Sequence, residues 1–154
     1  AVWIVRLTIG AAHPDQLYLY CLYAATGAIL GHNFPFYMNF KGGKGMAATA
    51  GLIFAFHPYF IVLGVILFFG TFFTTHYVSL GSLLVYAGFV IQMIVCGERG
   101  LFTGADRATL IEMYVIAFFL AALAYWMHRQ NIVRLLQGKE RKTYLTKKNK
   151  VDVE

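Results

Sequence analysis

Two long apolar stretches, residues 77–96 and 108–127, constrain the fold of this chain more than any other feature. Each is long enough for an α-helix to cross the ~30 Å hydrocarbon core of a bilayer, which takes about 20 residues. Charged residues make up only 13% of the chain, against about 25% in soluble domains. Because so little polar surface cannot coat a soluble globule, the composition argues against a cytosolic enzyme, a disordered tail and a secreted disulfide scaffold.

Four further apolar segments lie at residues 1–12, 17–31, 46–56 and 59–74. The second and fourth reach spanning length with their flanking aromatic residues, whereas 46–56 is only about 16 Å long as a helix. Segment 1–12 is typical of the end of a helix that begins elsewhere, and we expect its Arg6 to reach outward to the interface. Backbone in lipid must bond internally. We therefore predict an all-α, polytopic integral membrane bundle of about five to six helices.

Basic residues are concentrated at one end of the chain, since eight of the 13 Lys and Arg lie in residues 128–154. Positive charge stays on the cytoplasmic side of membrane proteins. We therefore predict a transmembrane bundle over 1–127, with a cytoplasmic Gly/Lys loop at 31–46, and a cytoplasmic C-terminal motif and basic tail over 128–154. The expected location is the cell (plasma) membrane. A single aromatic residue in the tail argues against nucleic-acid binding.

The loop before segment 46–56 has the composition of a phosphate site. Closely spaced glycines let successive N–H groups turn toward one point, and a following helix N-terminus adds positive potential. It is not a Walker A loop, because Gly follows the second lysine where Ser or Thr is needed. The alternative is a flexible basic loop on the inner membrane surface. The candidate phosphate ligands are Lys41, Gly42, Gly43, Lys44 and Gly45.

A second polar cluster, residues 128–140, follows the last apolar stretch directly. In a helix, His128, Asn131 and Arg134 lie three residues apart and share one face. His exchanges protons near neutral pH, and Asn and Arg orient anions. The alternative is a snorkelling helix at the membrane surface. Ser79 opens a helix at the same inner face, where it either donates to a phosphate or bonds back within its helix.

Metal and disulfide chemistry is not predicted. Cys21 and Cys96 lie far apart in apolar runs, with no His or Cys at metal-ligand spacing. We expect buried, inert thiols, no metal and no cofactor.

Long motifs support a family resemblance. Residues 31–51, which include His-Asn-Phe-Pro-Phe and Phe-Lys-Gly-Gly-Lys-Gly-Met-Ala-Ala-Thr, closely resemble the second motif of bacterial acyl-phosphate:glycerol-3-phosphate acyltransferases. Residues 128–140, His-Arg-Gln-Asn-Ile-Val-Arg-Leu-Leu-Gln-Gly-Lys-Glu, resemble their third motif. Tyr-Val-Ser-Leu-Gly-Ser at 77–82 is similar to a stretch between the two. The resemblance covers the chain except for its tail.

This resemblance implies a seven-helix inner-membrane enzyme with cytoplasmic motifs. Its activity moves a fatty acyl group from acyl phosphate to the 1-hydroxyl of sn-glycerol 3-phosphate. The products are 1-acyl-glycerol 3-phosphate (lysophosphatidic acid) and phosphate, in the first step of phospholipid synthesis. The implied partners are acyl phosphate, sn-glycerol 3-phosphate and membrane lipid, bound by a monomer. The family's first motif, which carries a Ser and an Arg, has no match here, so we expect about a quarter of a full-length member to be absent.

The same resemblance assigns roles to residues. Gly42, Gly43, Lys44 and Gly45 bind the glycerol phosphate, with Lys44 also stabilising charge in the reaction. His128 and Asn131 are catalytic, although either His128 or a substrate phosphate takes the proton. Further motif residues, expected to have structural roles, are His32, Asn33, Pro35, Thr49, Gly138 and Glu140.

Two other functions are compatible with parts of the sequence. A non-enzymatic carrier or channel for small phosphorylated anions would use the same anion site, but near the bilayer midplane between broken helices. A helical anchor whose basic tail binds lipid explains residues 128–154 but leaves the motif at 31–51 unexplained. Cationic clusters at the inner face favour chemistry on a lipid substrate.

Overall fold

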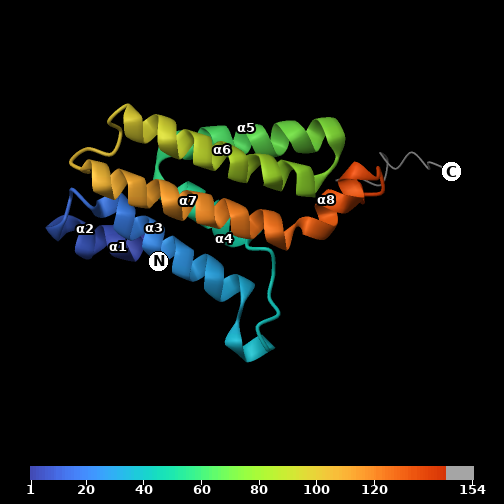
Figure 1. Cartoon of the computed structure of the whole chain (residues 1–154), viewed down its shortest axis with the longest axis horizontal. Coiled ribbons are helices and arrows are strands. Elements are labelled where there is room, and N and C mark those ends of the chain that lie inside the picture. The colour runs from blue at the N-terminus through green and yellow to red at the C-terminus, as the bar shows by residue number, and fades with distance from the viewer. Residues whose placement is uncertain (145–154) are drawn as a thin grey trace.

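The computed structural model describes residues 1–144, and every regular element in that range is a helix, which confirms the predicted all-α bundle (Figure 1). The part of the predicted basic tail beyond residue 144 lies outside the described residues. In chain order the elements are α1 (Val2–Leu7), α2 (Ile9–Ala12), α3 (Leu17–Asn33), the 3-10 turn η1 (Phe36–Met38), α4 (Met46–Phe56), α5 (Pro58–Thr75), α6 (Val78–Glu98), α7 (Arg107–Met127) and α8 (Arg129–Leu136).

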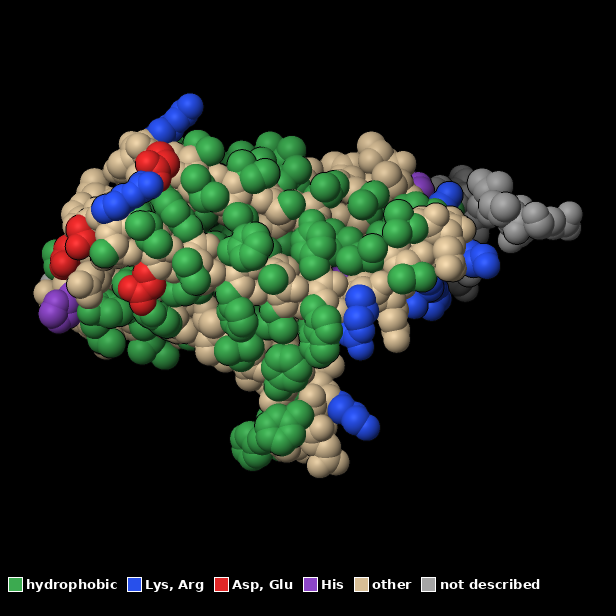
Figure 2. All heavy atoms as spheres, in the orientation of Figure 1, with side chains coloured by type: hydrophobic (Ala, Val, Ile, Leu, Met, Phe, Trp, Pro, Cys, Tyr) green, Lys and Arg blue, Asp and Glu red, His purple; other side chains and the backbone are tan. Residues whose placement is uncertain are grey.

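Three of the described helices, α5, α6 and α7, are long and apolar enough to cross a membrane, with 18, 21 and 21 residues. The two stretches that dominated the sequence form α6 and α7. Helix α3 has 17 residues and α4 only 11. In the space-filling view, apolar side chains cover the middle of the visible face, and charged side chains gather toward the two ends (Figure 2). This pattern matches a bundle whose sides face lipid.

The bundle is built by α6, which packs against α5 on one side and α7 on the other, while α3 packs against α4 and α7. Its core is aromatic at the end formed by the α4–α5 and α6–α7 connections, where the Phe56 ring lies within 6 Å of the Phe60 and Phe102 rings. Helices α5 and α6 approach closely at Gly88, where a Cβ would lie 2.3 Å from Leu67 Cδ1. A larger residue there would require the Leu67 side chain to move aside.

Segment 1–12 is not one helix, as the sequence suggested, but two short ones. The chain breaks at Thr8, with φ −113° and ψ −83°, and the Thr8 hydroxyl donates to the carbonyl of Ile4 at 2.7 Å. A threonine that bonds its own preceding turn in this way competes with helix continuation.

Arg6 does not reach outward, contrary to expectation, but caps the short helix α4. Its Nε donates to the carbonyl of Ala55 at 3.1 Å, a second guanidinium nitrogen donates to the carbonyl of Phe56, and the guanidinium lies over the Tyr18 ring. The last carbonyls of a helix have no partner within it. Arg6 therefore satisfies carbonyls of a helix that is too short to span the bilayer.

The other end of α4 is recessed within the bundle. Met46, its first residue, packs with Tyr86, which lies eight residues into α6, or about 12 Å from its start at 1.5 Å per residue. The buried hydroxyls of Thr49 and Tyr86 lie 2.6 Å apart, which ties the first turn of α4 to α6. The connection from η1 to α4, which carries Lys44, thus runs inward before α4 begins.

Candidate functional site

A polar pocket of about 500 Å³ lies at the end of the bundle where α4 begins and α8 follows α7. It brings together both polar clusters that the sequence identified, although they lie more than 80 residues apart in the chain. Its lining residues are Lys44, Met46, Val78, Ser79, Ser82, His128, Asn131, Arg134, Glu140, Arg141 and Thr143.

Asn131 is at the centre of a hydrogen-bond chain in this pocket. Lys44 Nζ donates to Asn131 Oδ1 at 2.5 Å, and Asn131 Nδ2 donates to Glu140 Oε1 at 2.6 Å. The Asn131 residue is only 7% exposed. Because a cation is bound to its oxygen and a carboxylate to its nitrogen, the amide is held in one orientation.

Glu140 joins three separate segments of the site. Its Oε1 also accepts from the Ser79 hydroxyl at 2.8 Å, and its Oε2 accepts from Arg134 Nε at 2.8 Å. Burial alone raises the pKa of Glu140, but the hydrogen bonds from Asn131, Arg134 and Ser79 outweigh it, and the net effect is a lowered pKa. The carboxylate is therefore ionised at neutral pH and ties α8 to the start of α6.

His128 has the tautomer and charge of a base. It is 3% exposed, and its Nδ1 lies 2.8 Å from the carbonyl oxygen of Ala124, which accepts only. Nδ1 therefore holds the ring proton, and the lone pair is on Nε2. Burial lowers the pKa of His128, the Lys44 charge lowers it further, and the Ala124 carbonyl and Glu140 only partly offset this. At neutral pH the ring is thus uncharged, as a general base must be.

The glycine loop is folded back on the segment before it. The N–H of Gly42 donates to the carbonyl of Asn33 at 3.1 Å, and the N–H of Gly43 donates to the carbonyl of His32 at 3.4 Å. A Cβ on Gly42 would lie 2.2 Å from the His32 carbonyl oxygen and 2.6 Å from Pro35 Cδ. These two amides are thus used within the motif, and Lys44 is the loop residue that lines the pocket. The other predicted loop ligands, Lys41, Gly42, Gly43 and Gly45, are not among its lining residues.

Asn33 explains why glycine is needed at position 45. Gly45 has φ +78°, and a Cβ there would lie 2.6 Å from the Asn33 Oδ1. Asn33 is 2% exposed, and its Oδ1 has no hydrogen-bond partner among the described residues. Since Thr49 holds the first turn of the helix, Asn33 and Thr49 together fix the start of α4 behind Lys44.

Sequence reasoning included Gly138 and Glu140 of the segment that follows α8 but missed Arg141 and Thr143. Gly138, with φ +66°, ends the helix, and the N–H of Lys139 bonds back to the carbonyl of Arg134 at 2.8 Å. This reversal returns Glu140 to the pocket and brings Arg141 and Thr143 to its edge. The signal available in the sequence was a glycine two residues before a lone carboxylate in a basic stretch. Ser79 does not bond back within its helix, because its hydroxyl donates to Glu140; Ser82 makes a bond of that kind instead, to the carbonyl of Val78 at 2.9 Å.

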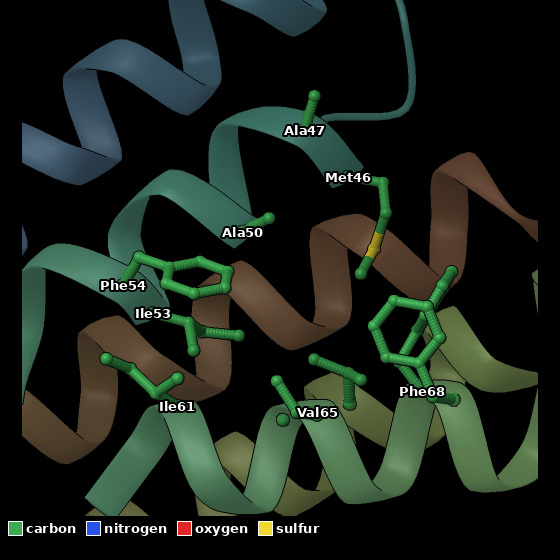
Figure 3. A pocket seen from close by; sticks show the side chains of 11 residues that line it. Met46, Ala47, Ala50, Ile53, Phe54, Ile61, Val65 and Phe68 are labelled. Atoms are coloured by element: carbon green, nitrogen blue, oxygen red, sulfur yellow. The ribbon is translucent and has the colours of Figure 1, made fainter. Parts of the chain in front are cut away.

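An apolar groove of about 420 Å³ lies next to the polar pocket, between α4 and α5 with a contribution from α6 (Figure 3). Met46 is common to both, because it also lines the polar pocket. In Figure 3, Met46 and Phe68 lie toward one end of the groove, and Phe54 and Ile61 lie toward the other. A polar site and a lipophilic groove therefore meet at one side chain.

Metal ligands do not gather in this part of the chain. Within residues 1–144 no group of three or more His, Cys, Asp or Glu side chains is placed to hold a metal ion.

Comparison with known proteins identifies the family of this chain. The family model described as glycerol-3-phosphate acyltransferase matches residues 1–138. The chain belongs to this family. The glycerol-3-phosphate acyltransferase of Mycoplasmopsis synoviae is 36% identical over 147 residues, which cover 92% of this chain and 65% of that protein. Glycerol-3-phosphate acyltransferase 2 of Bacillus cereus is 33% identical, over 96% of this chain and 69% of that protein. The chain thus spans about two thirds of the length of these relatives.

Crystal structures of PlsY (YgiH), an integral membrane glycerol 3-phosphate acyltransferase, are similar to this structure. The glycerol 3-phosphate form aligns with a TM-score of 0.68 and 29% identity, over 80% of this chain and 56% of that one. A second crystal structure of PlsY, at 23% identity and a TM-score of 0.65, supports the shared fold. The family resemblance and the multi-pass integral membrane fold are thereby confirmed.

Proposed function

We propose that this protein transfers a fatty acyl group from acyl phosphate to the 1-hydroxyl of sn-glycerol 3-phosphate. The products are lysophosphatidic acid and phosphate, in the first step of phospholipid synthesis. The observation that carries the proposal is the meeting of the polar pocket with the apolar groove at Met46. The reaction joins a small phosphorylated polyol to a long apolar chain, so it needs these two environments side by side.

The described residues supply a path for each atom. The 1-hydroxyl oxygen attacks the acyl carbonyl carbon and forms the ester bond, while the bond from that carbon to the phosphate oxygen breaks. The phosphate leaves with the electron pair. The hydroxyl proton goes to the free Nε2 of His128 or to a substrate phosphate oxygen. Lys44 bonds a neutral amide, so its charge is available to the anions, and Asn131 orients the hydroxyl.

Catalysis by this arrangement depends mainly on positioning. Acyl phosphate is already activated, so the site has to hold two anionic substrates together in reactive geometry. Orientation of this kind contributes on the order of 7–11 kcal/mol at best. The buried, mutually bonded side chains of Asn131 and Glu140 are suited to this, because neither has to reorganise during the reaction.

We further propose that the pocket faces the cytoplasm and that one chain is sufficient. Lys44, Arg134 and Arg141 are at the pocket end, and cytoplasmic loops of membrane proteins are enriched in such residues. All the described residues that line the polar pocket come from one chain, which supports a monomer. A carrier for phosphorylated anions is less well supported, since its cations should lie near the middle of the bundle.

The test is an assay of the purified full-length protein in lipid vesicles with acyl phosphate and labelled glycerol 3-phosphate. We expect labelled lysophosphatidic acid and one phosphate released per transfer. Lys44→Ala should raise the KM for glycerol 3-phosphate, and His128→Ala should lower kcat, while the matched control His13→Ala leaves both unchanged. Folded protein that forms no labelled lipid would sink the proposal. Uptake of label into vesicles without transfer would instead indicate a carrier.

A further inference from the structure

The segment after α8 forms a strap, residues 139–144, that closes one side of the polar pocket. Glu140 anchors its start through the bonds to Ser79, Asn131 and Arg134. Farther along, the N–H of Thr143 donates to the carbonyl of His76 at 2.9 Å, and the Tyr144 ring lies 4.8 Å from the His76 ring. The strap is thus attached at two points to the part of the molecule that carries the start of α6, and Arg141 lies between them.

Three cations and one carboxylate line the pocket: Lys44, Arg134, Arg141 and Glu140. Arg134 and Glu140 form an ion pair at 2.8 Å and neutralise each other. Lys44 bonds the uncharged Asn131 amide. Arg141 has no ion pair among the described residues. The lining therefore has an excess of two positive charges, at Lys44 and Arg141.

This excess matches the charge of one substrate group. A phosphate monoester carries about −1.5 to −2 charges near pH 7 and three acceptor oxygens. Lys44 alone neutralises about half of that charge as a point donor. A guanidinium supplies a planar pair of donors that fits two phosphate oxygens at once.

We propose that Arg141 is a second phosphate-binding residue of this pocket, beside Lys44 as the first, and that the attached strap holds it at the pocket. The inference rests on the proposed function for its substrates, but the binding of a phosphate group does not depend on acyl transfer. Two phosphates are available, that of glycerol 3-phosphate and that of acyl phosphate. Both have the chemistry that Arg141 recognises, so the experiment has to separate them.

The neighbouring cations of the strap do not share this role. Lys142 Nζ lies over the Tyr77 ring, 5.8 Å from its centroid, and does not line the pocket. Lys139 is exposed and is also not among the lining residues. Lys139→Ala thus removes the same charge from the same strap without touching the site, and it serves as the matched control.

The experiment measures KM for each substrate in the full chain carrying Arg141→Ala, Arg141→Lys or Lys139→Ala. We expect Arg141→Ala to raise one KM roughly tenfold, as the loss of a charge-assisted hydrogen bond predicts. Kcat should change much less, and Arg141→Lys should recover part of the loss. A raised KM for glycerol 3-phosphate assigns Arg141 to that phosphate, and a raised KM for acyl phosphate assigns it to the donor.

Direct binding of inorganic phosphate to the detergent-solubilised chain separates this inference from the proposed function. If wild-type protein transfers no acyl group but binds phosphate in an Arg141-dependent way, the function fails and the site stands. If Arg141→Ala matches Lys139→Ala in both KM values and in phosphate affinity, Arg141 is not a ligand. Equal thermal unfolding midpoints for the two variants exclude loss of the strap as the cause.

Discussion

Replacing Glu140 by glutamine tests whether the hydrogen-bond network holds the site together. The substitution keeps the size of the side chain and removes its charge. In the native protein the carboxylate accepts from Ser79, Asn131 and Arg134, and its side chain is only 7% exposed. The glutamine oxygen still accepts from Ser79 and Asn131, but as a neutral group. Its amide nitrogen is a donor and would face the Arg134 Nε–H, which is also a donor.

The expected loss of stability follows from these contacts. Hydrogen bonds to charged groups contribute about 1.5–3 kcal/mol and neutral ones about 0.5–1.5, so two weakened bonds cost about 1 kcal/mol each. The Arg134 side chain is 44% exposed, so solvent screening limits the ion pair to roughly 1 kcal/mol or less. Glu140→Gln should therefore lower the free energy of unfolding by about 2–3 kcal/mol. Because Asn131 loses its fixed orientation, kcat/KM should also fall, roughly tenfold for each 1.4 kcal/mol of lost positioning.

Equilibrium unfolding in mild detergent measures the first quantity, and the acyl-transfer assay measures the second. Glu98→Gln is the matched control. Glu98 also pairs with an arginine, Arg107, but at the opposite end and with exposed side chains. That control should change neither stability nor transfer measurably. If Glu140→Gln is as stable and as active as the control, the network does not position Asn131, and the reasoning from its geometry is wrong.

Three further predictions follow from the site and its supports. The lowered pKa of His128 leaves Nε2 unprotonated at pH 6.5. The acid limb of the kcat/KM profile, measured in overlapping buffers, should therefore lie below pH 6.5. If His128→Ala shows the same limb, a substrate phosphate takes the proton instead. Tyr86→Phe leaves the buried Thr49 hydroxyl without its partner and should cost about 1–3 kcal/mol of stability, and a double-mutant cycle with Thr49→Val should show strong coupling; additive losses would contradict the link between α4 and α6. Acyl transfer should persist after exhaustive chelation, whereas loss that a divalent ion restores would overturn the prediction of metal independence.

Much of the fold follows from the sequence because lipid leaves few options. A stretch of apolar residues such as 77–96 has to satisfy its own backbone in hydrocarbon, so its length and composition determine a helix. The distribution of lysine and arginine likewise indicates which connections share one side. The two polar motifs were also recognisable in the sequence, since each is long and ordered.

Local backbone breaks and the hydrogen-bond partners of individual groups could not be predicted from length and composition. Arg6 caps α4 through carbonyls about 50 positions away in the sequence. The break at Thr8 depends on a local choice, the bond of its hydroxyl to the carbonyl of Ile4. Spacing predicted glycine amides that turn toward a phosphate, but two of them bond the preceding segment, because the loop must pack on His32 and Asn33 to enter the bundle. The periodicity of apolar and polar residues in the sequence does not predict this kind of packing.

Length, hydropathy, charge distribution and motifs were enough to identify a membrane bundle with a basic end and two acyltransferase-like motifs. Which side chains meet depends on the packing of the helices. It brings Lys44 to Asn131 across 87 positions of sequence, returns Glu140 and Arg141 over the pocket, and places an apolar groove beside it at Met46. The physical reason is that local patterns fix the helices, whereas the neighbours of a side chain depend on how those helices pack.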